Sequence, residues 1–251
     1  NPFYSTNNDL ILRLLLKNNQ VWMTTKSGRI IIKDNNGNIR ELDLSANGNE
    51  ITAISEDGSG NTWILQRKAK NTLIRISPDF AVKEYPVLKN PESSFLTLET
   101  DSNGELYIGG HGAYSYLYKY NPSGDSLENL SVMVRGLKKK SFEITDMAFS
   151  NSGKMVLGSS EGLWEIKGNT LERIDLGEMN IESVSALCFD KQERIWFVNS
   201  SGLILLSGKQ ITVFNNYDGL PSTTITPRNI AIDENNTIWI GTNLGMASGT
   251  I

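Results

Sequence analysis

Residues 233–242 read Asp-Glu-Asn-Asn-Thr-Ile-Trp-Ile-Gly-Thr, and the same order of features recurs five more times along the chain. Each copy has a polar turn that leads into a short apolar strand with one anchor residue. The anchors are Trp22, Trp63, Tyr107, Val156, Trp196 and Trp239. They follow one another after 41, 44, 49, 40 and 43 residues. We therefore expect six tandem repeats, each about 43 residues long.

An acidic residue stands six positions before the anchor in four copies. These acids are Asp57, Asp101, Asp190 and Asp233, and the other two copies have Leu16 and Ser150 instead. A short carboxylate in a turn accepts hydrogen bonds from nearby backbone N–H groups, so we expect the acids to organise the turns. Because each acid is alone in its repeat rather than grouped at metal-ligand spacing, neither a metal site nor a cofactor is predicted.

A single repeat reads as four short strands separated by turns. The clearest example has strand-like segments at residues 184–189, 195–198, 203–206 and 211–214. A four-stranded unit repeated at this length predicts an all-β fold, a six-bladed β-propeller of four-stranded antiparallel blades. The anchors, on the second strands, are expected to pack between adjacent blades.

The whole chain, residues 1–251, is predicted to form a single propeller domain. The predicted blades span approximately residues 10–44, 51–88, 95–134, 143–176, 183–214 and 228–251. The last blade lacks a fourth strand, and we expect residues 1–5 to supply it and close the ring. The chain starts without a signal peptide and stops just after a repeat, which indicates a domain cut from a longer protein.

Charge and hydropathy limit the partners. A net charge of −4 and a pI near 5.2 argue against nucleic acid, which needs a basic surface. The basic runs at 67–70 and 138–140 are interpreted as solvated loop charges. The most apolar stretch, residues 10–16, is far shorter than the ~18 residues of a spanning helix, so no membrane contact is predicted. The lone Cys188 lies in an apolar run and is interpreted as structural.

One stretch carries a family resemblance. Asp218-Gly219-Leu220-Pro221-Ser222, followed by residues 230–233 and 238–246, resembles the two-component regulator propeller repeat, and residues 57–63 and 190–196 resemble it as well. The resemblance implies the sensor region of a bacterial hybrid two-component system, a class that typically responds to oligosaccharides. It implies a periplasmic or extracellular location, as part of a membrane-anchored protein.

The same resemblance implies the partners. They are an oligosaccharide or another small polar ligand, and the remaining domains of a parent sensor: a second propeller, a β-sandwich, a membrane helix and a kinase. A homodimer of the full-length receptor is compatible with it.

A ligand is expected on the face where the connections between blades meet the loops between second and third strands. The longest loops there are predicted at residues 109–116 and 135–142, and they should be neighbours. Their side chains His111, Tyr114, Tyr116, Lys138 and Phe142 form the predicted ligand wall, because aromatic faces with a few donors suit a sugar. The alternative is that the longer loop merely covers a sheet edge.

Catalytic candidates are few. His111 is the single histidine, which removes histidine metal clusters and two-histidine mechanisms. Glu143 and Glu182 could supply paired carboxylates, with exposed rim charges as the alternative interpretation. Residues 61–63, 74–77 and 84–85 also resemble the streptogramin-lyase type of repeat. We predict a sensing or binding module without enzymatic activity. A propeller lyase or hydrolase and a protein-interaction scaffold are the alternatives.

Overall fold

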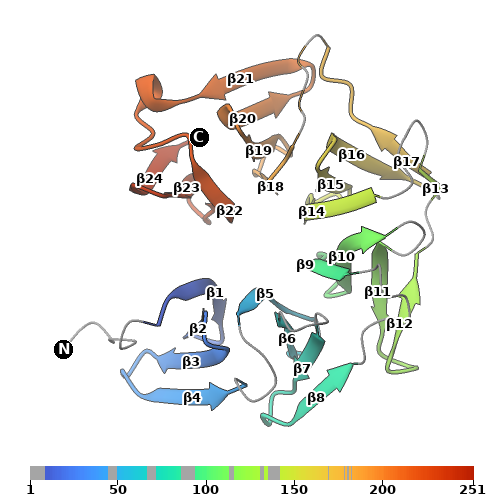
Figure 1. Ribbon diagram of the computed structural model, residues 1–251, viewed down its shortest axis with the longest axis vertical. Helices are drawn as coiled ribbons and strands as arrows, with labels where there is room; N and C mark the ends of the chain where they lie inside the picture. The colour runs from blue at the N-terminus through green and yellow to red at the C-terminus, as the bar shows by residue number, and fades with distance from the viewer. Residues whose placement is uncertain are drawn as a thin grey trace. The chain divides into compact units, whose positions relative to one another are not determined.

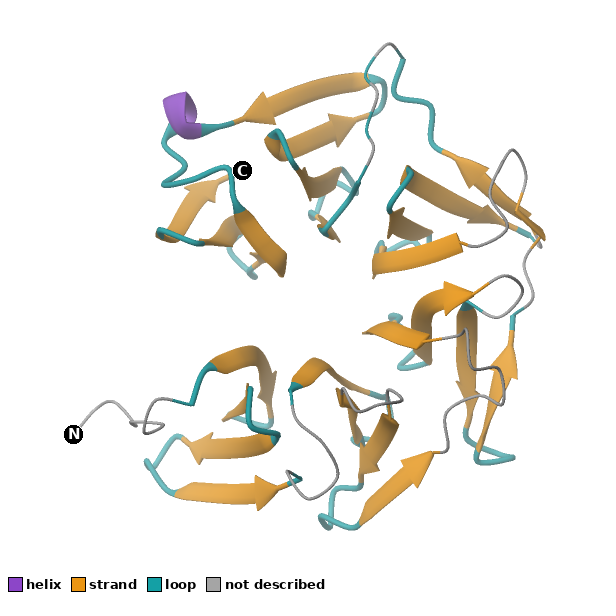
Figure 2. Ribbon diagram, in the orientation of Figure 1, coloured by secondary structure: helices purple, strands orange, loops and turns teal. Residues whose placement is uncertain are grey.

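The computed structural model describes residues 9–251 except 45–49, 67–71, 86–93, 113–115, 131–132, 135–141, 169, 178, 180 and 182. The described residues form strands β1 to β24 and one 3₁₀ helix at Asn216–Asp218 (Figure 2). The predicted all-β fold is confirmed. No helix in the described part of the chain is long and apolar enough to span a bilayer.

The chain divides into two compact units, Asn1–Ile108 and Gly109–Ile251. The first unit contains two four-stranded antiparallel sheets whose strands follow in chain order (Figure 1). The first sheet consists of β1 (Ile11–Lys17), β2 (Gln20–Thr25), β3 (Arg29–Asp34) and β4 (Ile39–Asp43). The second consists of β5 (Ile51–Glu56), β6 (Thr62–Gln66), β7 (Thr72–Ile76) and β8 (Val82–Tyr85).

The third group of strands includes the boundary between the units, which falls within β10. The group is β9 (Ser94–Thr100), β10 (Leu106–Gly112), β11 (Leu117–Asn121) and β12 (Ser126–Asn129). In the second unit, β10 also pairs with β14 through His111↔Glu143 and Gly112↔Phe142, which joins this group to the next sheet.

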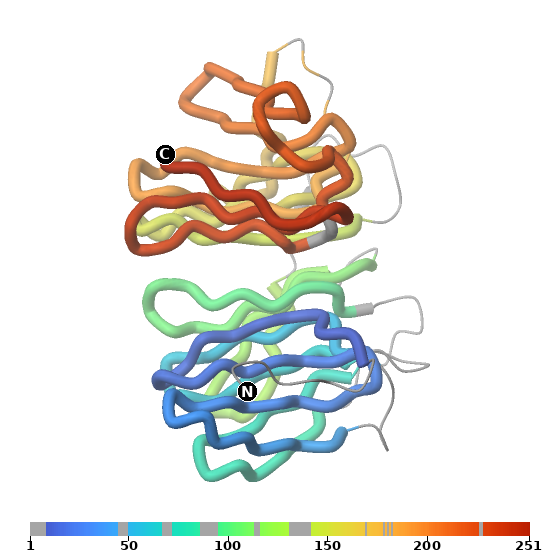
Figure 3. The backbone as a smooth tube through the Cα atoms, turned by 90° about the vertical axis from the view of Figure 1, so that its left-hand side faces the viewer, coloured from blue at the N-terminus to red at the C-terminus, as the bar shows by residue number. Residues whose placement is uncertain are grey.

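The rest of the second unit repeats the same meander. One meander consists of β14 (Phe142–Phe149), β15 (Met155–Ser159), β16 (Gly162–Lys167) and β17 (Thr170–Arg173), and β13 (Met133–Val134) pairs parallel to β17. The next consists of β18 (Ala186–Phe189), β19 (Ile195–Asn199), β20 (Gly202–Ser207) and β21 (Gln210–Phe214). The last consists of β22 (Ile225–Ile232), β23 (Thr237–Thr242) and β24 (Gly245–Thr250). Figure 3 shows the chain of each unit running back and forth along its sheets.

The antiparallel four-stranded blades that the repeat predicts are thus present. The last sheet has three strands among the described residues. The ring-closing role predicted for residues 1–5 lies outside the described residues, and the assignment of one domain to the whole chain stays a prediction.

Each unit buries a tryptophan anchor where one sheet packs on the next. Trp22, 3% exposed, lies in a cluster with Ile51 and Ile64 of the following sheet. In the second unit Trp196 packs in the same way against Ile225 and Ile238. These contacts bury large apolar side chains between adjacent sheets. Trp239 is 38% exposed, because no described sheet follows it within the second unit.

The acidic turns link the first strand of a sheet to the second. The Asp57 Oδ1 atom accepts backbone N–H bonds from Ser59 and Asn61, and Asp57 Oδ2 accepts the indole N–H of Trp63 at 2.7 Å. The same indole bond measures 2.9 Å at Asp190–Trp196 and at Asp233–Trp239. One carboxylate therefore fixes both the turn and the ring that fills the core.

The third copy separates these two roles, because its anchor is a tyrosine. Asp101 accepts hydrogen bonds from the backbone N–H groups of Asn103 and Glu105, but the side chain of Tyr107 has no N–H group that could replace the indole donor.

We predict that Asp57→Ala lowers the free energy of unfolding by about 2–4 kcal/mol, and Asp101→Ala by about 1–2 kcal/mol. Denaturant unfolding of both variants measures the difference, and equal losses would contradict a stabilising role of the indole bond.

Acid should weaken the turn that Asp190 organises. Burial alone would raise the pKa of Asp190, but hydrogen bonds from Trp196 and Arg194 outweigh it, so the pKa is lowered from its ordinary value of 3.8. A lowered pKa stabilises the fold at pH values above 3.8, and this contribution is lost as the pH falls through the folded-state pKa. We predict that Asp190→Asn is less stable than the parent at pH 7 and that the gap closes on acidification. A gap that is constant with pH would refute this assignment.

Candidate functional site

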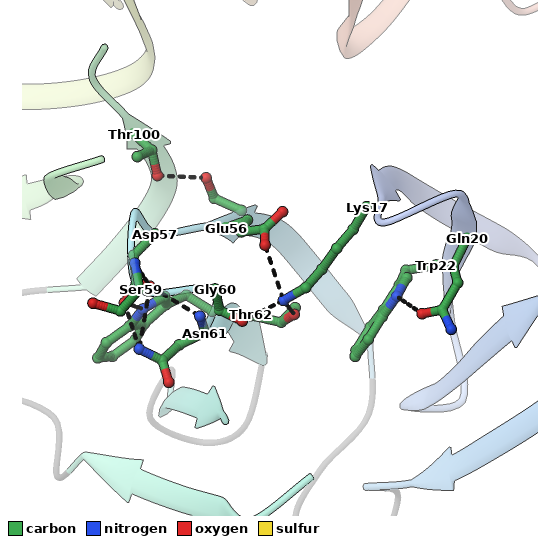
Figure 4. A network of polar contacts seen from close by, with 12 residues as sticks. Lys17, Gln20, Trp22, Glu56, Asp57, Ser59, Gly60, Asn61, Thr62 and Thr100 are labelled. Atoms are coloured by element: carbon green, nitrogen blue, oxygen red, sulfur yellow. Dashed lines mark hydrogen bonds and ion pairs between the residues drawn. The ribbon is translucent and has the colours of Figure 1, made fainter. Parts of the chain in front are cut away.

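One end of the sheets is occupied by contacts between successive turns that join first strands to second strands. In the first unit, Lys17 Nζ donates to the Gly60 carbonyl and to Thr62 Oγ1, and forms an ion pair with Glu56 at 3.2 Å (Figure 4). Lys17 is 7% exposed. All of these partners belong to the next sheet, so this buried lysine fastens the first sheet to the second.

The next pair of turns touches through its backbone. Gly58 N donates to Gly104 O at 2.8 Å. A Cβ atom on Gly104 would lie 2.3 Å from Gly58 Cα, and the φ angle of +78° also favours glycine there. The close approach of these turns therefore requires glycine.

The second unit uses side chains for the same contacts. Glu193 accepts the backbone N–H and the hydroxyl of Ser152 at 2.7 and 2.8 Å. Lys191 donates to the carbonyl of Glu234 in the following turn. Because the turns at this end hold sheet to sheet, the opposite end, where the first strands begin, is the better place for a ligand.

At that opposite end the first strands are irregular. Register shifts occur between Ile11 and Arg13, between Ile51 and Ala53, between Ile144 and Asp146, and between Ile225 and Ile230. Such bulges re-aim side chains and are common beside functional sites. Gly241 makes room for the widest bulge, since a Cβ there would lie 3.1 Å from the Cβ of Asn229.

Arg228 lies within the widest bulge in a strained conformation. Its φ angle is +59°, which a residue with a side chain adopts only when its surroundings impose it. Its backbone N–H donates to Ser185 O at 3.1 Å, which attaches β22 to the residue just before β18. Its side chain, 17% exposed, reaches β14, where Nε and Nη2 donate to the Thr145 carbonyl at 3.2 and 3.1 Å.

Asp146 supplies the negative charge beside this guanidinium. Its Oδ1 lies 3.9 Å from Arg228 Nε, while Oδ2 accepts the backbone N–H of Leu187 at 2.9 Å. Thr145 donates its hydroxyl to the Val184 carbonyl. The first strands of three successive sheets thus share one polar cluster, formed by Thr145, Asp146 and Arg228, which we call the inner-strand cluster.

Two of the predicted wall residues are packed inside the second unit. Tyr116 and Phe142, 4% and 3% exposed, make an edge-on ring contact at 5.2 Å, and Phe142 makes another with Trp164 at 5.5 Å. Burial raises the pKa of Tyr116 to about 12. The expected adjacency of the two chain segments is present, but these two rings are packed against protein and their faces are not open to a ligand.

The other predicted residues are placed only in part. His111 is half-buried on β10, which continues to Gly112 and so includes residues 109–112 of the segment that was predicted to be a loop. It lies opposite Glu143 in the β10–β14 pair. Tyr114 and Lys138 lie outside the described residues, so their part in ligand binding stays a prediction. Glu182, a candidate for the carboxylate pair with Glu143, also lies outside them.

The inner-strand cluster was not found from the sequence. Thr145 and Asp146 stand in an apolar strand with no unusual spacing, and their importance depends on a partner about 80 residues away. The one available signal was the segment Pro227-Arg228-Asn229, which interrupts the apolar pattern of β22.

Among the described residues there is no group of three or more His, Cys, Asp or Glu side chains that could hold a metal ion. The inner-strand cluster offers hydrogen-bond donors and acceptors, with the guanidinium of Arg228 and the carboxylate of Asp146 at its centre.

Two substitutions can separate the strain at Arg228 from its contacts. Arg228→Ala removes the side-chain bonds and keeps the strain, whereas Arg228→Gly removes both. We predict that both variants are less stable than the parent and that the glycine variant is more stable than the alanine variant by about 1 kcal/mol. Denaturant unfolding provides the comparison, and an alanine variant at least as stable as the glycine variant would show that the backbone is relaxed.

Comparison with solved structures defines the class of fold. The chain superposes on virginiamycin B lyase from Staphylococcus aureus with a TM-score of 0.76 at 15% identity, covering 99% of this chain and 86% of the lyase. It also matches the extracellular domain of a protein described as a hybrid two component system from B. thetaiotaomicron, with a TM-score of 0.76 at 16% identity, covering 97% and 33%. PorZ, a surface component of the type-IX secretion system of Porphyromonas gingivalis, matches with a TM-score of 0.70 at 18% identity, covering 94% and 37%.

The fold is therefore that of a β-propeller, and the chain spans about a third of the length of the sensor ectodomain that it matches. Residues 219–244 match the model of the two component regulator propeller. A search of curated proteins gave no match. The match lies within the last of the stretches that carried the resemblance, and it covers the Trp239 anchor and the whole bulge that holds Arg228.

Proposed function

We propose that this chain is a ligand-sensing or binding propeller, a part of the ectodomain of a bacterial two-component sensor, and that its ligand is an oligosaccharide or another small polar molecule. The observation that carries the proposal is the regulator propeller repeat at residues 219–244. The fold similarity to the extracellular domain of a hybrid two component system supports it. The chain then belongs to the periplasmic or extracellular part of a membrane-anchored protein.

The inner-strand cluster is the preferred place for the ligand. It lies at the end of the sheets that the turn-to-turn contacts leave available. The positive φ angle of Arg228 costs stability, and strained residues of this kind are found preferentially at functional sites. Carbonyl, hydroxyl, carboxylate and guanidinium groups converge there. A polyhydroxylated ligand needs such a mixture of donors and acceptors.

An enzymatic function is the second candidate, and one juxtaposition favours it. His111 lies opposite Glu143 on paired strands, and a carboxylate beside an imidazole can orient it as a general base. The lyase that shares the fold is described with quinupristin in a catalytically inactive histidine-to-alanine variant. A lyase or hydrolase would turn its ligand over, whereas a sensor would only bind it.

A thermal-shift screen against defined oligosaccharides, with mass spectrometry of every positive sample, distinguishes the candidates. We expect stabilisation without product, amounting to about 2.7 kcal/mol at a ligand concentration of 100 times Kd. Arg228→Lys should reduce the shift, because lysine lacks the fork of donors. Lys209→Ala, an exposed charge on the β20–β21 turn, should leave it unchanged.

The remaining outcomes count against the proposal. Product formation would promote the lyase or hydrolase interpretation. The absence of any shift across the screen would favour a protein-interaction scaffold, a role compatible with the fold similarity to a secretion-system surface component.

A further inference from the structure

Tyr217 is the most exposed large hydrophobic side chain among the described residues. It is 100% exposed, in the connection between β21 and β22. It belongs to the short 3₁₀ helix Asn216–Asp218, at the end of the sheets that the turn-to-turn contacts do not occupy. A tyrosine ring in full contact with water gains nothing from burial in the core.

The backbone under the ring is held firmly. The Asn215 side chain accepts the N–H of Tyr217 at 2.9 Å, and the Asp218 carboxylate accepts the N–H of Asn215 at 2.9 Å, which makes a reciprocal capping box. Gly219 closes the helix with a φ angle of +98°. The turn is therefore a rigid support for an outward-pointing ring.

Both ends of this support are anchored in the core. Phe214, just before it, stacks on Trp196 at 5.6 Å. Leu220, just after it, is 8% exposed and belongs to the same cluster as Trp196 and Ile225. The ring is presented on a structure that cannot easily collapse to cover it.

We infer that Tyr217 is a stacking platform for a pyranose ring, and this inference rests on the proposed oligosaccharide function. A pyranose has one face of C–H groups and a rim of hydroxyls, so it matches an aromatic face with polar neighbours. Asn216 and Asp218, the chain neighbours of Tyr217, are exposed polar residues. Tyrosine has few rotatable bonds, so ordering it on a ligand costs little conformational entropy.

The test starts with the whole chain on an array of defined glycans. The affinity for the best glycan is then measured by calorimetry for the parent, Tyr217→Ala, Tyr217→Phe and Val82→Ala, the last being a truncation of another exposed side chain. We expect Tyr217→Ala to weaken binding about tenfold, while Tyr217→Phe, which keeps the ring face, stays within about twofold. Val82→Ala should bind like the parent.

A second readout does not depend on the stability of variants. In the parent protein with labelled tyrosines, the ring resonances of Tyr217 should shift when the glycan is added, and unchanged resonances would refute the platform. Unweakened binding by Tyr217→Ala would refute it too, yet would leave the oligosaccharide function intact. The absence of binding to any glycan on the array would overturn both.

Discussion

The fold depends on a turn carboxylate whose two oxygens accept hydrogen bonds from different groups. At Asp57 and Asp190, one oxygen accepts the N–H groups of the turn, and the other accepts the indole N–H of a tryptophan six residues later. The turn thereby sets the position of the ring, and the ring fills the space against the next sheet. Local turn geometry and long-range packing are coupled in each of these repeats, and this coupling makes a short sequence motif sufficient to specify a blade.

The two ends of each sheet then take on different roles. At the end with the acidic turns, neighbouring turns bind each other through Lys17, Gly58, Ser152 and Lys191. At the other end, the first strands bulge and polar side chains cross between sheets. Regular contacts hold neighbouring sheets together at one end, and the irregular backbone lies at the other.

Repeat spacing predicted the fold well because each copy reports the same four-stranded unit, so six weak signals support one another. The site was harder to predict. Tyr116 and Phe142 belong to long connections in the sequence, but strand β10 runs on to Gly112, and pairing with β14 brings the two rings into a buried contact. Arg228 depends on a bulge and on a partner strand distant in sequence, and neither leaves a periodic trace. Contacts between distant segments, rather than local propensity, decide these positions.

The fourth copy has neither the acid nor the tryptophan at the expected places, yet its core is filled. Ser150 caps the turn by accepting the N–H of Lys154, and Trp164 on the adjacent strand β16 fills space beside Phe142 while donating to Ser159. A ring can therefore be supplied from either of two neighbouring strands without changing the blade. The same backbone course can therefore be built from different aromatic positions, in keeping with solved structures that share this fold at 14–18% identity.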